Sequence, residues 1–456
     1  MYNLVNPFDQ SVLGEIAYHR PSEIQEKLDV LEIAQQQLSS LSLGQRQQLV
    51  REGVTRLVAQ RDQVARDISL QMGKPIAQSQ REVDTFVSRA QRAILDAETA
   101  LAGDEIVLND GITRRIEHAP LGIVFNIGAW NYPLLIPVNV IVPALLAGNT
   151  VLLKHSAKTP WTGSAIASAF GQLPELPNLV CDCILDHDAA CALVTDARIA
   201  HVAFTGSVRG GHHICEAAAA RFIDVGLELG GKDPAYVACD ADLDFAAENI
   251  VDGACYNAGQ SCCAIERVYV HKDVYDAFLE KCLPFVQAYK LGDPFDSSTT
   301  LGPLARRAGL KELKNHVDTA IADGARLLAG GHPVPGTAGN FFEPTLLADV
   351  PQSTLVMQEE SFGPLIPVAA VPSDEEAIAR MNDSRYGLTA SVWTRDRDRA
   401  MSMARQLQAG TIFQNRCDFV DPSQPWTGWG DSGRGSTLSR YGFWNLTRRK
   451  SLHLRG

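Results

Sequence analysis

The feature that most constrains this chain is a change of hydrophobic period at residue 121. From there, short apolar runs of strand length alternate with stretches of helical length. The runs are LGIVFNI (121–127), TVLLK (150–154), LVCDCI (179–184), HVAFTGS (201–207) and FIDVGLEL (222–229). Continuous apolar strands separated by helices are typical of βαβ units, in which a parallel sheet is covered on both faces. The pattern therefore predicts an α/β fold.

The rest of the chain has three other patterns. Residues 22–102 have helical spacing, interrupted at Gly73-Lys74-Pro75. A second α/β series is predicted from about 234 to 420, with strands near 266–271 and 390–395. Residues 112–118 alternate apolar and polar side chains, as a half-exposed strand does, and the tail from Pro422 ends in the strand-like SLHLR.

Length and charge exclude several classes of protein. A chain of 456 residues suggests two or three domains, and 45% hydrophobic with 21% charged residues exclude disordered, collagen-like and coiled-coil proteins. The net charge of −12 argues against duplex nucleic acid and anionic membranes as partners. The longest apolar stretch, 134–148, is too short and too interrupted to span a bilayer.

The cysteines and the N-terminus favour a reducing compartment. Ten cysteines are too few for a disulfide framework. The start MYNLVNPFDQ has neither a basic segment nor an apolar run, so we expect no signal peptide and a cytoplasmic protein. Cys181-x-Cys183 lacks a histidine at ligand spacing, and we expect no metal site.

Three residues are candidates for chemistry. Cys262 follows a glycine-containing turn and precedes a strand, where a thiol can be exposed beside backbone N–H groups. Glu228 closes an apolar strand before Gly230-Gly231, so its carboxylate can face a crevice as a general base. Asn131 follows a strand and can donate to an oxyanion. Taken singly, each has a structural alternative: a buried thiol, an ordinary strand-end carboxylate and a helix N-cap.

Together with their neighbours these residues form an ordered series of motifs. The series is Pro120-Leu121-Gly122-Ile123-Val124, Trp130-Asn131-Tyr132-Pro133, Leu153-Lys154, Phe204-Thr205-Gly206-Ser207, Glu228-Leu229-Gly230-Gly231-Lys232, Gly259-Gln260-Ser261-Cys262, Glu359-Glu360-Ser361-Phe362-Gly363-Pro364 and Tyr386-Gly387-Leu388. In motif, order and approximate spacing the chain resembles the aldehyde dehydrogenase superfamily over essentially its whole length.

The resemblance implies a reaction at Cys262. As a thiolate it attacks an aldehyde, while Asn131 and the Cys262 N–H stabilise the oxyanion. Hydride passes to NADP or NAD and leaves a thioester, which water activated by Glu228 hydrolyses to the acid. Cys263 is the structural alternative as nucleophile, but the Gly-Gln-x-Cys motif selects Cys262.

The resemblance also implies a dinucleotide site. Lys154 resembles the lysine that holds the adenosine ribose, and Gly206 and Ser207 open a helix suited to a pyrophosphate. Trp130, Gly230, Glu360 and Phe362 match further cofactor positions, the last two at the nicotinamide ribose and ring. Ala157 stands where many NAD-preferring relatives carry a glutamate, so we expect dual use with a slight preference for NADP.

Two departures from the family pattern bear on substrate and assembly. Asp233 stands where serine or asparagine commonly follows Gly-Gly-Lys, and Gly430 replaces a lysine in the late glycine-rich motif. Asn139 and Tyr256 stand where many succinate-semialdehyde dehydrogenases have arginines, which argues against a dicarboxylic semialdehyde unless Arg416 substitutes. The pattern favours a neutral or broad-range aldehyde; the acidic loop 415–421 leaves a cationic aminoaldehyde as an alternative.

The expected architecture follows from the same resemblance. Residues 1–110 and 121–229 are expected to form a Rossmann-like cofactor domain, and 230–421 an α/β catalytic domain. Residues 111–120 and 422–456 are expected to form a small β element that joins subunits into a homodimer or homotetramer. Two alternatives remain: a CoA-acylating enzyme, which commonly lacks a base at the Glu228 position, and a catalytically silent protein on the same fold.

Overall fold

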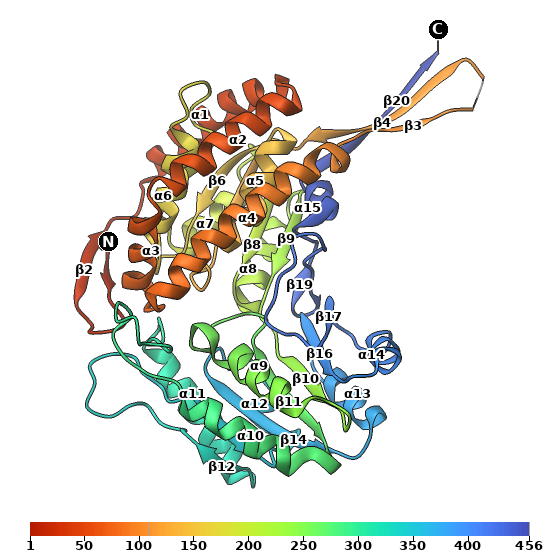
Figure 1. Ribbon diagram of the computed structural model, residues 1–456. Helices are drawn as coiled ribbons and strands as arrows, with labels where there is room; N and C mark the ends of the chain where they lie inside the picture. The colour runs from red at the N-terminus through yellow and green to blue at the C-terminus, as the bar shows by residue number, and fades with distance from the viewer. Residues whose placement is uncertain (109, 456) are drawn as a thin grey trace.

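The computed structural model describes residues 1–108 and 110–455. Two largely parallel sheets dominate it (Figure 1). The six-stranded sheet is, in spatial order, β19 (Gly433–Arg434), β9 (Asp224–Glu228), β8 (Ile199–Thr205), β5 (Ile123–Ile127), β6 (Thr150–Lys154) and β7 (Val180–Asp182). The seven-stranded sheet is β12 (Arg326–Ala329), β13 (Thr345–Ala348), β14 (Leu365–Val371), β11 (Ile265–His271), β10 (Asp233–Val237), β16 (Thr389–Trp393) and β17 (Thr411–Gln414). The predicted α/β fold is confirmed.

Helices cover both faces of the six-stranded sheet because its strands are apolar on both sides. Val124 and Leu153 pack into one buried cluster and Phe125 and Leu152 into another, on the opposite face. The N-terminal helical region consists of α1 (Pro21–Ser40), α2 (Leu43–Val58), α3 (Arg61–Met72) and α4 (Ile76–Ala100). The remaining helices here are α5 (Leu135–Ala147), α6 (Pro160–Gly171), α7 (His187–Val194), α8 (Val208–Ala218) and α15 (Ser439–Asn445).

The seven-stranded sheet has its own helices and its own large core. They are α9 (Leu243–Cys255), η1 (Tyr256–Gly259), η2 (Lys272–Val274), α10 (Tyr275–Gln287), α11 (Ala308–Ala322), α12 (Leu355–Gln358), α13 (Asp374–Asn382) and α14 (Arg397–Ala404). Two small pairs, β1 (Tyr2–Val5) with β2 (Val12–Ile16) and β15 (Tyr386–Gly387) with β18 (Trp429–Gly430), complete the body.

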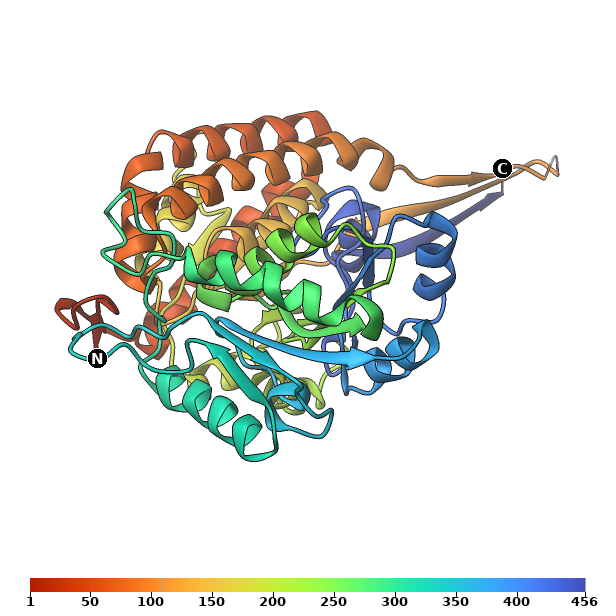
Figure 2. The same ribbon diagram turned by 60° about the horizontal axis from the view of Figure 1, so that its bottom comes forward.

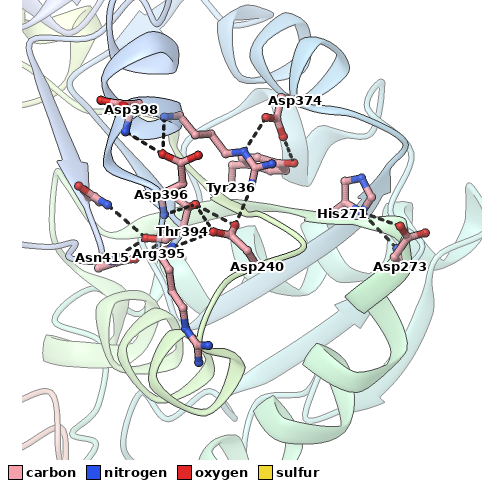
Figure 3. Close-up of polar contacts among 12 residues, drawn as sticks. Tyr236, Asp240, His271, Asp273, Asp374, Thr394, Arg395, Asp396, Asp398 and Asn415 are labelled. Carbon is pink, nitrogen blue, oxygen red and sulfur yellow. Dashed lines mark hydrogen bonds and ion pairs between the residues drawn. The ribbon is translucent and has the colours of Figure 1, made fainter.

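Residues 229–232 join the two sheets, between the carboxyl end of β9 and the amino end of β10. The carboxyl edge of one sheet therefore faces the amino edge of the other. At the far, carboxyl edge of the seven-stranded sheet, polar groups satisfy one another (Figure 3). Asp240 accepts hydrogen bonds from Thr394 Oγ1 (2.8 and 2.9 Å), Asp374 accepts one from Tyr236 (2.6 Å), and Arg399 pairs with both carboxylates. The polar groups at that edge are therefore paired with one another. The candidate site described below lies instead between the two sheets.

A three-stranded sheet projects from the body (Figures 1 and 2). In it β4 (Ile112–Pro120) lies between β3 (Asp104–Ile106) and β20 (Thr447–Arg455). The predicted strand at 112–118 is confirmed and pairs with β20 along its whole length. The tail also contributes to the body, because β19 pairs antiparallel with β9 through Gly433 and Glu228.

Two glycines of α2 test how tightly the helices pack. A Cβ at Gly53 would overlap the ring of the buried Phe170 on α6, whereas a Cβ at Gly44 has open space. We expect Gly53→Ala to lower Tm by about 3 °C or more through overpacking, and Gly44→Ala to leave it unchanged or raise it slightly. Thermal unfolding of both variants measures this, and equal Tm values would contradict the packing.

Candidate active site

A cavity with about 1000 Å³ of empty space opens between the two sheets. All the predicted site residues except Lys154 and Ala157 line it. These are Trp130, Asn131, Gly206, Ser207, Glu228, Gly230, Cys262, Glu360 and Phe362. Residues more than 200 positions apart in the sequence thus meet in one place. Among residues 1–108 and 110–455, no three His, Cys, Asp or Glu side chains form a cluster able to hold a metal ion.

A strained turn presents Cys262 to the cavity. Asn257, Ala258 and Gly259 have positive φ of 54°, 56° and 69°, and a Cβ on Gly259 would overlap the backbone of Gly363. Glycine is therefore required there for both conformation and space. The turn leaves Cys262 partly exposed at the cavity wall.

The neighbouring Cys263 points into the protein instead. Its side chain is buried and donates to Asp418 Oδ1 (3.2 Å), which also accepts from Ser261 (2.7 Å). Hydrogen bonding to Cys262 and burial raise the pKa of the Cys263 thiol. Cys263 is thus held as a neutral structural thiol.

Asn131 is a buried amide beside the thiol rather than a helix N-cap. The helix α5 begins four residues later, at Leu135, so the cap alternative is wrong. The Asn131 Nδ2 donates to the carbonyl of Gln260 (3.2 Å), which leaves its second N–H free for another acceptor. Within the described residues, the backbone N–H of Cys262 donates to no protein group. Two donors are therefore available next to the sulfur.

A buried ion pair fixes the turn that carries Asn131. Lys74 and Glu82, both almost inaccessible, form a salt bridge. The Lys74 ammonium also donates to the Asn131 carbonyl (3.0 Å), and Glu82 Oε1 accepts from the Leu134 N–H (2.9 Å). Lys74, between α3 and α4, holds one end of the turn, and Glu82 of α4 holds the other. The ion pair therefore positions the Asn131 amide.

Glu228 ends β9, partly buried at the wall of the cavity. Thr437 donates to Oε1 and Thr205 to Oε2 (3.2 Å). Burial raises the pKa of Glu228 above the usual range for glutamate, and the two threonine hydroxyls and the charge of Arg89 oppose the rise. A carboxyl group in this setting titrates closer to neutral pH, as a general base requires.

A second buried ion pair supports the segment with Glu360 and Phe362. Lys232 Nζ lies 2.7 Å from Glu266 Oε2, and the Glu266 carboxylate accepts from the backbone N–H groups of Ser361 and Phe362, both at 2.8 Å. The Phe362 ring meets Trp130 edge to face, with centroids 5.5 Å apart. Burial raises the pKa of Glu360 to about 8.

The cavity walls fit a dinucleotide. Ser207 is the N-cap of α8 and accepts from Gly210 N (3.2 Å), so this helix start offers its N–H groups and dipole to a phosphate. A Cβ on Gly230 would overlap the Glu360 carboxylate, and one on Gly206 the Phe204 ring. A larger residue at either position would have to displace the Glu360 or Phe204 side chain.

Lys154 and Ala157 lie beyond the cavity lining. Lys154 ends β6, beside Ile127 of β5, and its burial lowers the pKa of the ammonium. Ala157 is exposed in the following loop. Both stand at the same carboxyl edge of the six-stranded sheet as Gly206.

The two departures from the family pattern have local explanations. Asp233 is buried at the start of β10 and accepts from the backbone N–H (3.1 Å) and hydroxyl (2.6 Å) of Thr389, which ties β10 to β16. Gly430 has φ +55° and pairs with Tyr386, and a Cβ there would overlap the Arg385 carbonyl. This backbone excludes a lysine at position 430.

Comparison with known proteins agrees with this geometry. The model of the aldehyde dehydrogenase family matches residues 1–452. The chain belongs to the aldehyde dehydrogenase family. It is 35% identical to an aldehyde dehydrogenase of Paenarthrobacter nicotinovorans, covering 96% of each chain. It is also 35% identical to the probable succinate-semialdehyde dehydrogenase [NADP(+)] of Synechocystis sp., covering 98% of each.

A solved structure shows the same fold. Lactaldehyde dehydrogenase from Escherichia coli superposes with a TM-score of 0.96 at 31% identity, covering 100% of this chain and 96% of that one. The predicted family and enzyme class, an oxidoreductase acting on aldehydes, are confirmed. None of the described helices combines the length and apolarity needed to cross a membrane.

Sequence reasoning missed the residues that position the site. Lys74, Glu82, Thr437 and Asp418 carry no motif of their own. The available signal was a charge at a core-facing position: Glu82 shares the buried face of α4 with Phe86 and Arg89, at helical spacing.

Proposed function

We propose that this aldehyde dehydrogenase oxidises its substrate to a carboxylic acid through a covalent Cys262 intermediate, with NADP or NAD as the hydride acceptor. The observation that carries the proposal is the shared cavity, which brings the Cys262 thiol, the Asn131 amide and the Glu228 carboxylate together. Each has the environment its role needs: partial exposure for the thiol, burial with free donors for the amide, and a raised pKa for the carboxylate.

In the first half-reaction the Cys262 sulfur bonds to the aldehyde carbon. The carbonyl oxygen becomes an oxyanion that accepts hydrogen bonds from Asn131 Nδ2 and the Cys262 N–H. When bound, the nicotinamide supplies the two-electron acceptor that takes up the hydride. Trp130, Gly206, Ser207, Gly230, Glu360 and Phe362 would hold the cofactor. Loss of hydride leaves the substrate carbon as a thioester of Cys262.

In the second half-reaction Glu228 takes a proton from water. The water oxygen attacks the thioester carbon, the carbon–sulfur bond breaks, and the thiolate of Cys262 leaves with the bonding electrons. The acid is released and Glu228 returns its proton to solvent. CoA-acylating relatives commonly lack a base at the Glu228 position, so the presence of Glu228 in the cavity favours water as the acyl acceptor.

The cofactor edge favours NADP slightly. Ala157 offers no carboxylate to repel a 2′-phosphate, and Lys154 and Lys158 flank it in sequence. Burial, and to a lesser extent the charge of Arg306 at the cavity wall, lowers the pKa of Lys158, so two cationic groups lie near this edge. An ammonium can hold a phosphate by charge-assisted hydrogen bonds.

The assembly we propose is a homodimer or homotetramer in the cytoplasm. The projecting sheet of β3, β4 and β20 has unpaired edges that a second copy can cover. All ten cysteines are free, as a reducing compartment maintains them.

The two adjacent cysteines test the nucleophile. We expect Cys262→Ala to abolish aldehyde oxidation while cofactor binding, followed by fluorescence titration, stays intact. Cys263→Ala serves as the matched control and retains most activity, because its buried thiol does not line the cavity and donates to Asp418. Comparable turnover in Cys262→Ala and the wild type would exclude this nucleophile.

Glu228→Gln separates the two half-reactions. Hydride loss needs the thiolate and the oxyanion donors, whereas hydrolysis also needs the base. We expect a burst of about one equivalent of reduced cofactor per subunit, followed by a stall. Stopped-flow absorbance measures it; undiminished steady turnover would remove Glu228 from the mechanism, and loss of the burst would assign it to activating Cys262.

Thr437→Val tests the electrostatics of the base. The Thr437 hydroxyl stabilises the ionised Glu228, so its loss raises the pKa of Glu228 further. The active form of a general base is the deprotonated one, present above its pKa. The ascending limb of kcat should therefore move to higher pH, by up to roughly one unit. A pH–rate profile with an unchanged limb would contradict the assignment.

Ala157→Glu tests cofactor choice. A carboxylate there repels the 2′-phosphate, so we expect the ratio of kcat/KM for NADP over NAD to fall about tenfold or more, chiefly through weaker NADP binding. The wild type should accept NADP at least comparably to NAD. A wild-type preference for NAD above about 100-fold, worth roughly 2.7 kcal/mol, would refute the expectation.

A further inference from the structure

Arg89 is a buried arginine that the proposed reaction does not use. It lies on α4 and is 9% exposed. Its Nη1 donates to the Leu135 carbonyl and to Asn139 Oδ1, both at 3.2 Å. Its Nε is buried without any hydrogen-bond partner. Over residues 1–108 and 110–455, no carboxylate lies within salt-bridge distance of the guanidinium.

An arginine in this state lacks an anion. The guanidinium carries five N–H donors and a fixed positive charge, and burying it without a counter-ion is costly. Two buried cations near the site are paired, Lys74 with Glu82 and Lys232 with Glu266. Within the part of the chain that the structure describes, Arg267 has no carboxylate partner but donates to the backbone carbonyls of Lys232, Arg380 and Met381. Arg89 has a buried Nε with neither kind of partner, so its free donors point to a ligand that supplies the negative charge.

Arg89 faces the catalytic centre. Of the charges that favour its protonated form, that of Glu228 is the largest, followed by that of Cys263. It lines a small cavity of about 20 Å³, together with Asn139, Leu438 and Asp96. Leu438 in turn packs with Cys263 and the partly buried Cys262. The guanidinium therefore borders a space that shares a wall with the nucleophile.

We propose that Arg89 binds a carboxylate at the far end of the aldehyde substrate, and that the enzyme therefore prefers anionic semialdehydes. Its Nε and Nη2 present the side-on pair of donors that a carboxylate accepts in bidentate fashion. Asn139 orients the guanidinium through its amide oxygen rather than replacing an arginine. The inference rests on the proposed function, because the aldehyde end must reach Cys262.

This inference reverses the substrate preference expected from the sequence. That expectation rested on Asn139 and Tyr256, where relatives carry arginine, and it weighed only Arg416 as a substitute. The structure brings a guanidinium to Asn139 from another helix, 50 residues away in the chain.

The test compares two four-carbon aldehydes, succinate semialdehyde and butanal, which differ by the terminal carboxylate. We expect the wild type to favour succinate semialdehyde in kcat/KM by about tenfold or more. In Arg89→Gln the ratio of the two kcat/KM values should fall about 100-fold, and Arg89→Lys should retain an intermediate ratio. Arg61→Gln, on α3 and paired with Asp84 of α4 outside the lining of the Arg89 cavity, is the matched control and keeps the wild-type ratio.

A second measurement does not depend on turnover. Succinate should slow the alkylation of Cys262 by iodoacetamide in the wild type, and less so in Arg89→Gln; butyramide should protect neither. Protection without oxidation of any aldehyde would leave the anion site standing and refute the proposed function. Two results would overturn the role of Arg89 and leave the proposed function intact. In the first, Arg89→Gln lowers kcat/KM by the same factor for both aldehydes. In the second, succinate protects Cys262 equally in the wild type and in Arg89→Gln. If Arg89→Gln is insoluble, Arg89→Lys decides: a wild-type ratio of kcat/KM for succinate semialdehyde over butanal in that variant would also overturn the role of Arg89.

Discussion

The site depends on the short connection between β9 and β10. With only residues 229–232 between them, the carboxyl edge of the six-stranded sheet must face the amino edge of the seven-stranded sheet. Glu228 ends one strand, and Cys262 precedes β11, the neighbour of β10. Base and nucleophile are thus carried by different sheets, and the short link brings both to the wall of the same cavity. Ligands of open parallel sheets usually bind at the carboxyl edge of the strands. Here the six-stranded sheet presents that edge to the cavity, whereas the seven-stranded sheet presents its amino edge.

Buried ion pairs keep the loops at this junction in place. Lys74–Glu82 holds the turn of Asn131, and Lys232–Glu266 holds the backbone of Ser361 and Phe362. Burying charges costs several kcal/mol per ion, which only good geometry and further hydrogen bonds offset. In both pairs those further bonds go to backbone groups of the loops. The hydrogen bonds that offset the cost of burying these charges therefore also hold the loops that line the cavity.

The sequence predicted the fold, and it predicted residues that line one cavity, because both leave local signals. Apolar runs of strand length identify the sheets, and Gly259-Gln260-Ser261-Cys262 and Glu228-Leu229-Gly230-Gly231 are contiguous motifs. The interpretation of Asn131 as a helix N-cap is wrong because the chain stays irregular up to Leu134, whose N–H donates to Glu82, and α5 begins only at Leu135.

What the sequence did not predict depends on contacts between distant segments. Thr437 reaches Glu228 only because β19 pairs with β9, and a residue that acts through such a contact has no spacing to reveal it. The same applies to Arg89, whose meeting with Asn139 depends on the packing of α4 on α5. An alignment compares one position of the chain with the same position in relatives. A group that binds substrate can instead come from any helix or strand that borders the same cavity.

Positive side chains lie at both ends of the candidate site. The chain has a net charge of −12, yet cations gather at both ends of the site. Lys154, Lys158 and Arg306 stand at or near the cofactor edge, and Arg89 borders the space beyond Cys262. An acidic surface repels anions in general, so local positive charge has to select the anions that are admitted. A phosphate at one end and a carboxylate at the other would neutralise these cations only when both ligands are in place, which makes the filled site electrostatically more favourable than the empty one.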